Sequence, residues 1–176
     1  VLIGTDLSIN RIVPLNGNLI NQEYADVPTS LFVPFDNDTF ISYHTVPLTV
    51  NVNNPSAEVT ALYHNQSRKG FVIGSIEHRD WKTGIITAMD VDKKISVQTI
   101  CGFTDESITR DKMTHGYLKG NSVSSAKVFF GAFDDWRLGM ETYAKLNRIS
   151  EPPIVFKWNN ATPVGWNSWG VMQERI

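Results

Sequence analysis

The sequence is short of several features that would point to particular classes of protein. Its 176 residues contain a single cysteine, so no internal disulfide can form, and its formal net charge is only −2. A charge so near zero gives no electrostatic reason for binding nucleic acid or an acidic membrane. No apolar run reaches the roughly eighteen residues that a membrane-spanning helix needs. We therefore expect neither a nucleic-acid partner nor membrane insertion, and we expect Cys101 to be a buried, unreactive thiol.

Motifs for cofactors and for common catalytic centres are also absent. The sequence has no Gly-rich phosphate loop and no Gly-x-Ser-x-Gly nucleophile elbow. Its histidines lie in separate segments, without the close spacing of metal ligands. The paired acids have structural explanations, because Asp134 and Asp135 begin a helix whereas Asp90 and Asp92 flank a turn. We assign no catalytic residue, no metal site and no cofactor to these residues.

Composition and pattern favour a mainly β fold. A hydrophobic content of 41% with 19% charged residues is typical of a globular domain. Up to about residue 133, β-branched and aromatic runs alternate with turn clusters such as Asn53–Ser56. These runs predict strands at Ser30–Val33, Phe40–His44, Leu48–Val52, Val59–His64, Gly70–Ile76, Gly84–Met89, Lys94–Cys101 and Ser124–Phe133. With no helical period between them, they favour an antiparallel β-sandwich.

One helix is predicted near the carboxyl end of the chain. Asp134 is placed to be its N-cap, and Asp135 adds negative charge to its first turn. The helix is expected to run from about Asp135 to Arg148 and to end before Pro152 and Pro153, which cannot continue it. Its apolar stripe, widened by Ala144, is formed by Trp136, Met140, Tyr143 and Asn147.

The segment after this helix carries the most specific motif in the chain, Pro163-Val164-Gly165-Trp166-Asn167-Ser168-Trp169. Pro163 suits the first residue of a strand because it has no N–H to donate, and Gly165 permits close approach of a neighbour. The two tryptophans would point to opposite faces of such a strand. A strand with an indole on each face is expected to be buried on both, as barrel strands are.

This run resembles the opening of the catalytic barrel in α-galactosidase-type glycoside hydrolases. A looser match to the amino-terminal lobe of the larger, microbial members of that family lies at Gly70–Gly84. The resemblance implies a supersandwich-like β-sandwich domain over residues 1–133 and a linking helix and connector over 134–160. Residues 161–176 would be the first strand of a truncated (β/α)8 barrel, so that the chain is the front part of a larger enzyme.

The resemblance also implies roles for particular residues. In that family the second tryptophan of the run lines the sugar subsite, which implies substrate binding by Trp169 and packing by Trp166. Family members are retaining glycosidases with two aspartates on later barrel strands, so catalysis would lie beyond this chain. The implied partner is an α-linked oligosaccharide or glycoside. The lobe itself would support the barrel, oligomerise and lend a loop to the sugar site.

Secondary site candidates lie in the densest polar cluster of the chain, which contains His78, Asp80 and Trp81. On the family interpretation this cluster faces the barrel mouth, and otherwise it is a solvated hairpin end. A second class of function also stays open, because closely spaced tryptophans are common in packed cores. The chain would then be a stand-alone carbohydrate-binding or adhesion β-sandwich. The sequence assigns neither the sugar nor the compartment.

Overall fold

The computed structural model describes residues 1–19, 27–35, 42–154, 161 and 165. This part of the chain is mainly β-structure, with a single helix, α1 (Trp136–Ser150), at its carboxyl end. The strands are β1 (Leu2–Ile9), β2 (Ile12–Leu19), β3 (Thr29–Phe32), β4 (His44–Pro47), β5 (Asn53–Ala57), β6 (Val59–Tyr63), β7 (Gly70–Ser75), β8 (Thr83–Met89), β9 (Ile95–Cys101), β10 (Leu118–Val123) and β11 (Val128–Phe133). The predicted fold class, antiparallel β with one carboxyl-terminal helix, is confirmed.

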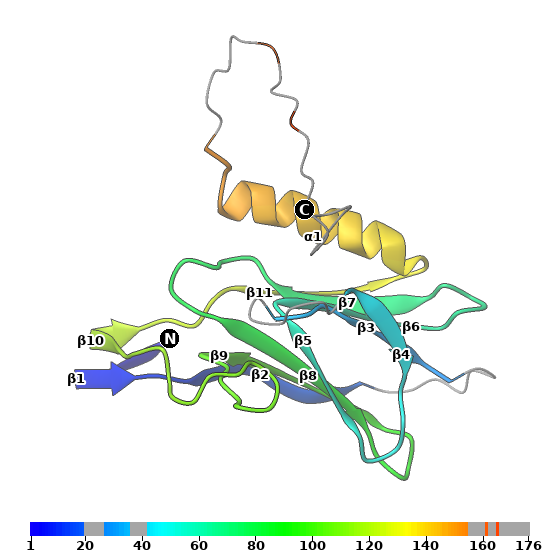
Figure 1. Cartoon of the computed structure of the whole chain (residues 1–176), viewed down its shortest axis with the longest axis horizontal. Helices are drawn as coiled ribbons and strands as arrows, with labels where there is room; N and C mark the ends of the chain where they lie inside the picture. Colours follow the sequence, from blue (N-terminus) through cyan, green and yellow to red (C-terminus); the bar gives the residue numbers. More distant parts are fainter. Residues whose placement is uncertain (20–26, 36–41, 155–160, 162–164, 166–176) are drawn as a thin grey trace, which may run out of the picture.

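The strands form two large sheets and a separate ribbon. One sheet has the order β11-β7-β6-β3-β4 and the other the order β2-β9-β8-β5, while β1 pairs with β10. Figure 1 shows the two large sheets stacked, with α1 on the outer face of the five-stranded sheet and the β1–β10 ribbon projecting at one end. Every pairing between these strands is antiparallel. The described residues form no closed barrel.

The main core lies between the two large sheets. Residues two apart on a strand share a face, so Ile85 and Met89 of β8 point inward together with Ile95 and Val97 of β9. From the opposite sheet they meet Leu62 and Ile73. Ile73 and Ile85 have no exposed surface at all. Burying such a side chain stabilises the fold by about 1.5 to 3 kcal/mol, so this layer holds the sandwich together.

Buried hydroxyl groups connect the sheets across this core. The Ser30 hydroxyl oxygen lies 3.2 Å from that of Thr60 on its own sheet and 3.3 Å from that of Thr87 on the other. Thr60 also donates to the Leu31 carbonyl at 2.7 Å. Because a buried hydroxyl without a partner costs stability, these contacts favour one alignment of the two sheets over others of equal apolar burial.

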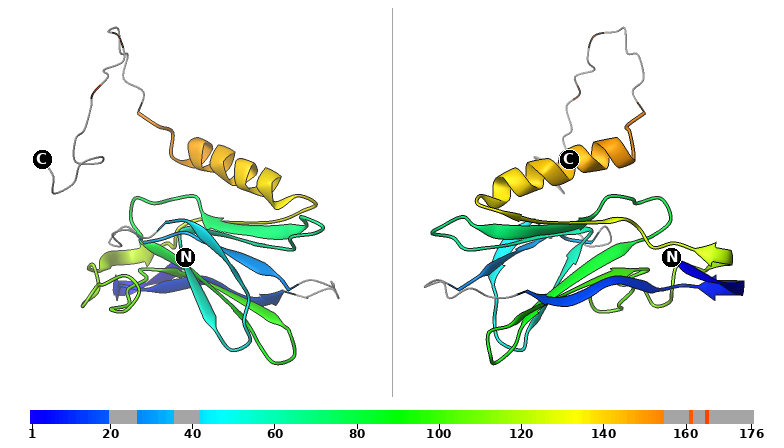
Figure 2. Two further views of the ribbon diagram at one scale, coloured as in Figure 1. Left: turned by 45° about the vertical axis from the view of Figure 1, so that its right-hand side comes forward. Right: turned by 180° about the vertical axis from the view of Figure 1, so that it is seen from behind.

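A second core lies between the five-stranded sheet and α1 (Figure 2). Trp136 stacks on Tyr63 with ring centroids 4.4 Å apart, and the Tyr143 hydroxyl donates to the Ser75 carbonyl at 2.9 Å. Gly139 is buried at the contact with Val72, which lets the helix backbone approach the sheet closely. Burial raises the pKa of Tyr143 to about 12, so the phenol stays neutral and remains a donor.

Two details of the helix prediction are wrong. The N-cap is Asp135, whose carboxylate accepts from the Arg137 N–H at 3.1 Å, while Asp134 points to solvent and pairs with Lys69 at 3.2 Å. Ala144 is exposed rather than part of the buried stripe. The N-cap differs because the helix begins at Trp136, one residue later than predicted. Ala144 is exposed because the helix contacts the sheet through Gly139, Met140 and Tyr143.

The strand predictions fail where edge strands carry polar residues or proline. Leu48–Val52 is not a strand, apart from an isolated bridge at Val50, and the predicted turn at Asn53–Ser56 belongs to β5. Pro55 fits there because β5 is an edge strand with a free N–H side. The run Ser124–Phe133 becomes a strand only at Val128, and β1, β2 and β10 were not predicted at all. The start of the predicted strand at Phe40 lies outside the described residues.

The close seating of α1 on the sheet generates a prediction. A Cβ on Gly139 would lie 2.6 Å from Val72 Cγ2 and 2.7 Å from Phe133 Cδ2. Gly139→Ala should therefore lower the free energy of unfolding by about 1 to 3 kcal/mol, although Ala is the better helix former by about 1 kcal/mol. Urea denaturation measures the change. Ala144→Gly, on the exposed face of the same helix, is the control and should cost about 1 kcal/mol; a stabilised Gly139→Ala protein would contradict the packing.

Candidate functional site

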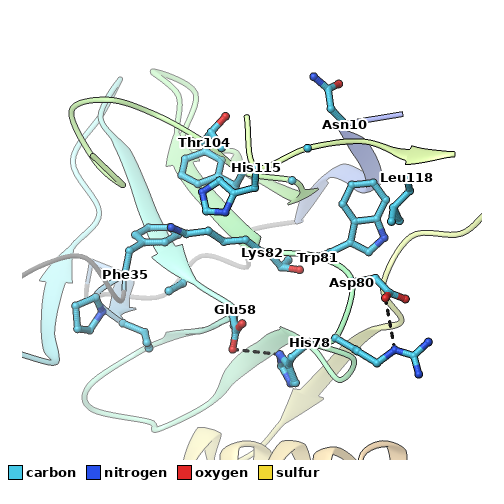
Figure 3. A pocket seen from close by; sticks show the side chains of 18 of the residues that line it. Asn10, Phe35, Glu58, His78, Asp80, Trp81, Lys82, Thr104, His115 and Leu118 are labelled. Atoms are coloured by element: carbon cyan, nitrogen blue, oxygen red, sulfur yellow. Dashed lines mark hydrogen bonds and ion pairs between the residues drawn. The ribbon is translucent and has the colours of Figure 1, made fainter. Parts of the chain in front are cut away.

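A groove of about 840 Å³ opens on the molecule where the junction between β5 and β6 meets the loops after β7 and β9 and the segment before β10. Figure 3 shows side chains from these segments converging on it. Its polar lining includes Asn10, Glu58, His78, Asp80, Lys82, Thr104 and His115, and its aromatic lining includes Phe35, Tyr43, Trp81, Phe103 and Tyr117. Aromatic side chains together with convergent polar groups are common in binding sites.

All three secondary candidates from the sequence line this groove. Trp81 is only 8% exposed, and its indole N–H donates to the Ser124 carbonyl at 2.8 Å. It packs with Cys101, so its ring anchors the loop rather than offering a free face. Asp80, next to it, is exposed and lies beside Arg79. The loop is therefore a well-anchored element whose polar side chains reach the groove.

His78 connects the groove to two other elements. Its Nδ1 lies 3.1 Å from a carboxylate oxygen of Glu58, and its Nε2 lies 3.1 Å from the amide oxygen of Asn147 on α1. Its backbone N–H donates to Glu151 at 2.8 Å. Glu58 has a positive φ of 61° where the chain passes from β5 to β6, a conformation that L-residues adopt only when their surroundings enforce it.

A second charged cluster, formed by Lys82, Asp111 and His115, lies beside the groove. Asp111 is 3.1 Å from the Lys82 ammonium and 2.9 Å from His115 Nε2, and its side chain is only 11% exposed. Desolvation raises the pKa of this carboxyl, but hydrogen bonds from Thr109, His115 and Lys82 outweigh it and lower the pKa to about 2. The Lys82 ammonium also lies over the Phe35 ring, 5.8 Å from its centroid.

Two carboxylates of this region lie against basic side chains, Asp111 against Lys82 and His115, and Glu58 against His78. Two aromatic side chains of the lining are largely exposed, Tyr43 to 71% and Tyr117 to 57%. They provide flat apolar faces with a polar tip.

Sequence reasoning found one loop of this site and missed the rest. Glu58, Lys82, Asp111 and His115 show no motif spacing, because they come from segments that only the fold brings together. The positive φ of Glu58 leaves no trace in residue type. Trp166 and Trp169 lie outside the described residues, so the sugar-subsite role expected for Trp169 stays a prediction.

Other expectations concern metals, membranes and the lone cysteine. Within residues 1–19, 27–35 and 42–154, no three His, Cys, Asp or Glu side chains converge on a point where a metal ion could bind. No helix in this part of the chain has the length and apolar character needed to cross a membrane. Cys101 is fully buried, and this burial raises the pKa of its thiol, which disfavours the reactive thiolate.

The ion pairs of Asp111 predict how stability depends on pH. A carboxyl whose pKa is lowered on folding stabilises the protein above its ordinary pKa of 3.8, and this contribution is lost as the pH falls toward about 2. Between pH 5 and pH 2 we expect the native protein to lose about 1 to 2 kcal/mol more unfolding free energy than Asp111→Asn. Urea denaturation at several pH values between 5 and 2 measures this difference in unfolding free energy. Asp92→Asn, in an exposed turn, should keep the native dependence, and equal slopes for the native protein and Asp111→Asn would contradict the pairing.

The groove and the motif after α1 are the features from which a function can be inferred. No protein-family model matches the chain, and no curated protein and no solved structure matches it either. The chain's own residues carry the functional information, and the loop at His78 connects the groove to the end of α1.

Proposed function

We propose that the chain is the amino-terminal, non-catalytic β-sandwich lobe of a retaining glycoside hydrolase similar to α-galactosidases, acting on α-linked sugars. The observation that carries the proposal is the order of elements. A many-stranded antiparallel sandwich is followed by one helix, and then by the run from Pro163 to Trp169 that resembles a first barrel strand. In this role the lobe supports a catalytic barrel of which this run is the first strand.

The contacts of α1 support a positioning role for the lobe. The helix is seated on the five-stranded sheet through Tyr143, and its carboxyl end is bonded to His78 through Asn147 and Glu151. The chain continues from that end toward Pro163. The connector to the proposed barrel would therefore leave the lobe from an anchored helix end, and the exposed Asp80 on the groove loop would be available to a sugar at the barrel mouth.

A second candidate function is favoured by the groove itself. Tyr43 and Tyr117 expose their rings beside donors and acceptors such as Thr104 and Asn10. Sugars are bound by aromatic faces together with hydrogen-bonding groups at the edge of the ring. A stand-alone carbohydrate-binding module would therefore use this groove, with the tryptophans after α1 serving in packing.

An activity assay distinguishes a non-catalytic lobe from a chain that is an enzyme by itself. The purified chain of residues 1–176 should not hydrolyse an aryl α-galactoside, because the proposal puts both catalytic carboxylates on later barrel strands. The same lobe followed by its barrel should release the aryl group at a readily measured rate. Turnover by the 176-residue chain that is abolished by Glu58→Gln or Asp80→Asn would overturn the proposal.

Replacing the two tryptophans of the run tests the barrel interpretation in the full-length enzyme. Trp169→Ala should reduce kcat/KM by an amount equivalent to about 1 to 3 kcal/mol, the scale of an aromatic contact and one hydrogen bond, with a smaller loss of stability. Trp166→Ala should mainly destabilise the fold, by roughly 3 to 5 kcal/mol. Steady-state kinetics and melting midpoints distinguish them. Native catalysis with a collapsed fold in Trp169→Ala would assign that residue to the core.

A further inference from the structure

His78 is placed so that both nitrogens of its ring face oxygen atoms. Nε2 lies 3.1 Å from the amide oxygen of Asn147 on α1, and Nδ1 lies 3.1 Å from a carboxylate oxygen of Glu58 at the junction of β5 and β6. Figure 3 shows Glu58 and His78 meeting at the groove. A neutral imidazole carries one N–H and one bare nitrogen, so it can donate to only one of these two oxygens.

The orientation of the Asn147 amide is fixed by Tyr143. The single hydroxyl hydrogen of Tyr143 is donated to the Ser75 carbonyl at 2.9 Å. The Asn147 side chain also hydrogen-bonds to this hydroxyl, and it does so through its NH2 group because the hydroxyl oxygen is left only to accept. The amide oxygen is thereby turned toward His78, and Nε2 must carry a hydrogen in this arrangement.

The second nitrogen, Nδ1, decides which charge state of the ring fits its surroundings. Nδ1 is buried, and its approach to Glu58 lacks the alignment of a hydrogen bond. A bare Nδ1 would turn its lone pair to a carboxylate oxygen only 3.1 Å away and repel it, whereas a protonated ring attracts that carboxylate. The backbone N–H of His78 donates to Glu151 just after α1, and positive charge is favoured at the carboxyl end of a helix. The contacts therefore fit the protonated ring.

The charged and titratable groups around His78 come from α1, from the β5–β6 junction, from its own loop and from the segment before β11. They are Tyr143, Arg148 and Glu151 on α1, Glu58 at the junction, Glu77, Arg79 and Asp80 on the loop, and Lys127 before β11. Glu77 pairs with Lys127, and burial raises the pKa of Tyr143 to about 12. Carboxyl, guanidinium and ammonium groups ordinarily titrate outside the range from about pH 6 to pH 8, so His78 is the member of this set that changes charge there.

We propose that His78 is a pH-sensitive clamp of the groove. Its protonated ring bonds Asn147 and attracts Glu58 at the same time, and on losing the Nδ1 proton it keeps Asn147 and releases Glu58. The released carboxylate, on a side chain that is 44% exposed, is then available as an acceptor in the groove. The clamp lies wholly within the described residues, so it does not depend on whether the chain belongs to a glycoside hydrolase.

The pH dependence of stability tests the sign of the effect. The attraction between the ring and Glu58 is present at about pH 6 and is lost as the ring gives up its proton toward pH 8. Over this range the folding equilibrium constant of the native chain should fall about three- to tenfold more than that of Glu58→Gln or of His78→Gln, each of which removes one partner. Urea denaturation measures these constants, and circular dichroism checks that the variants fold. His44→Gln, which removes an exposed histidine of β4, should keep the native fall.

Nuclear magnetic resonance of the 176-residue chain tests the contacts themselves. Between about pH 6 and pH 8 the side-chain amide signal of Asn147 and the backbone amide signal of Glu58 should shift with the same midpoint as the His78 ring. His78→Gln should abolish both shifts. His115→Gln, which removes the groove histidine that faces Asp111, should leave both midpoints unchanged. The clamp would be overturned if these signals did not follow the His78 ring, or if the native chain and Glu58→Gln lost stability equally between pH 6 and pH 8.

Discussion

The contact between the two large sheets is the constraint on which the rest of the molecule depends. Ile73 and Ile85 supply the apolar burial, and the hydroxyls of Ser30, Thr60 and Thr87 select one alignment of the sheets. The chain crosses from one sheet to the other at Glu58, whose N–H donates to the Thr83 carbonyl and whose own carbonyl accepts from Ser75. If the sheets shifted, Glu58 would lose both partners and its place in the lining of the groove.

The crossing between the sheets positions the polar side chains of the groove. The His78 ring lies beside Glu58, and His78 contacts the carboxyl end of α1 through Asn147 and Glu151, so that sandwich, groove loop and helix are connected. Glu58 and Asp111 lie against basic side chains at this groove, whereas Asp80 stays exposed. These contacts are compatible with the proposed role, in which the lobe positions a barrel and contributes contacts to a ligand.

The sequence predicted best those strands whose own residues show a clear apolar pattern. β6, β7, β8 and β9 were predicted within about one residue because each is rich in β-branched and apolar residues and has at least one face buried in the core. β5 was mistaken for a turn because Asn and Pro favour turns in general, and only its place at a sheet edge makes them acceptable in a strand. For the site, the loop of His78, Asp80 and Trp81 was found from its density of polar groups. Its partners were not, because contacts between distant segments leave no local pattern.

The sequence by itself determined the fold class, the helix near Trp136 and the central strands, because these depend on periodicity and capping within a few neighbouring residues. It also supplied the motif at Pro163–Trp169 on which the proposed activity depends. Only the tertiary structure decided which strands became edges, that Trp81 is an anchor rather than a binding surface, and that Glu58 meets His78. Each of these depends on which distant segments share a sheet, and that choice is made by the summed burial and hydrogen bonding of the whole sandwich.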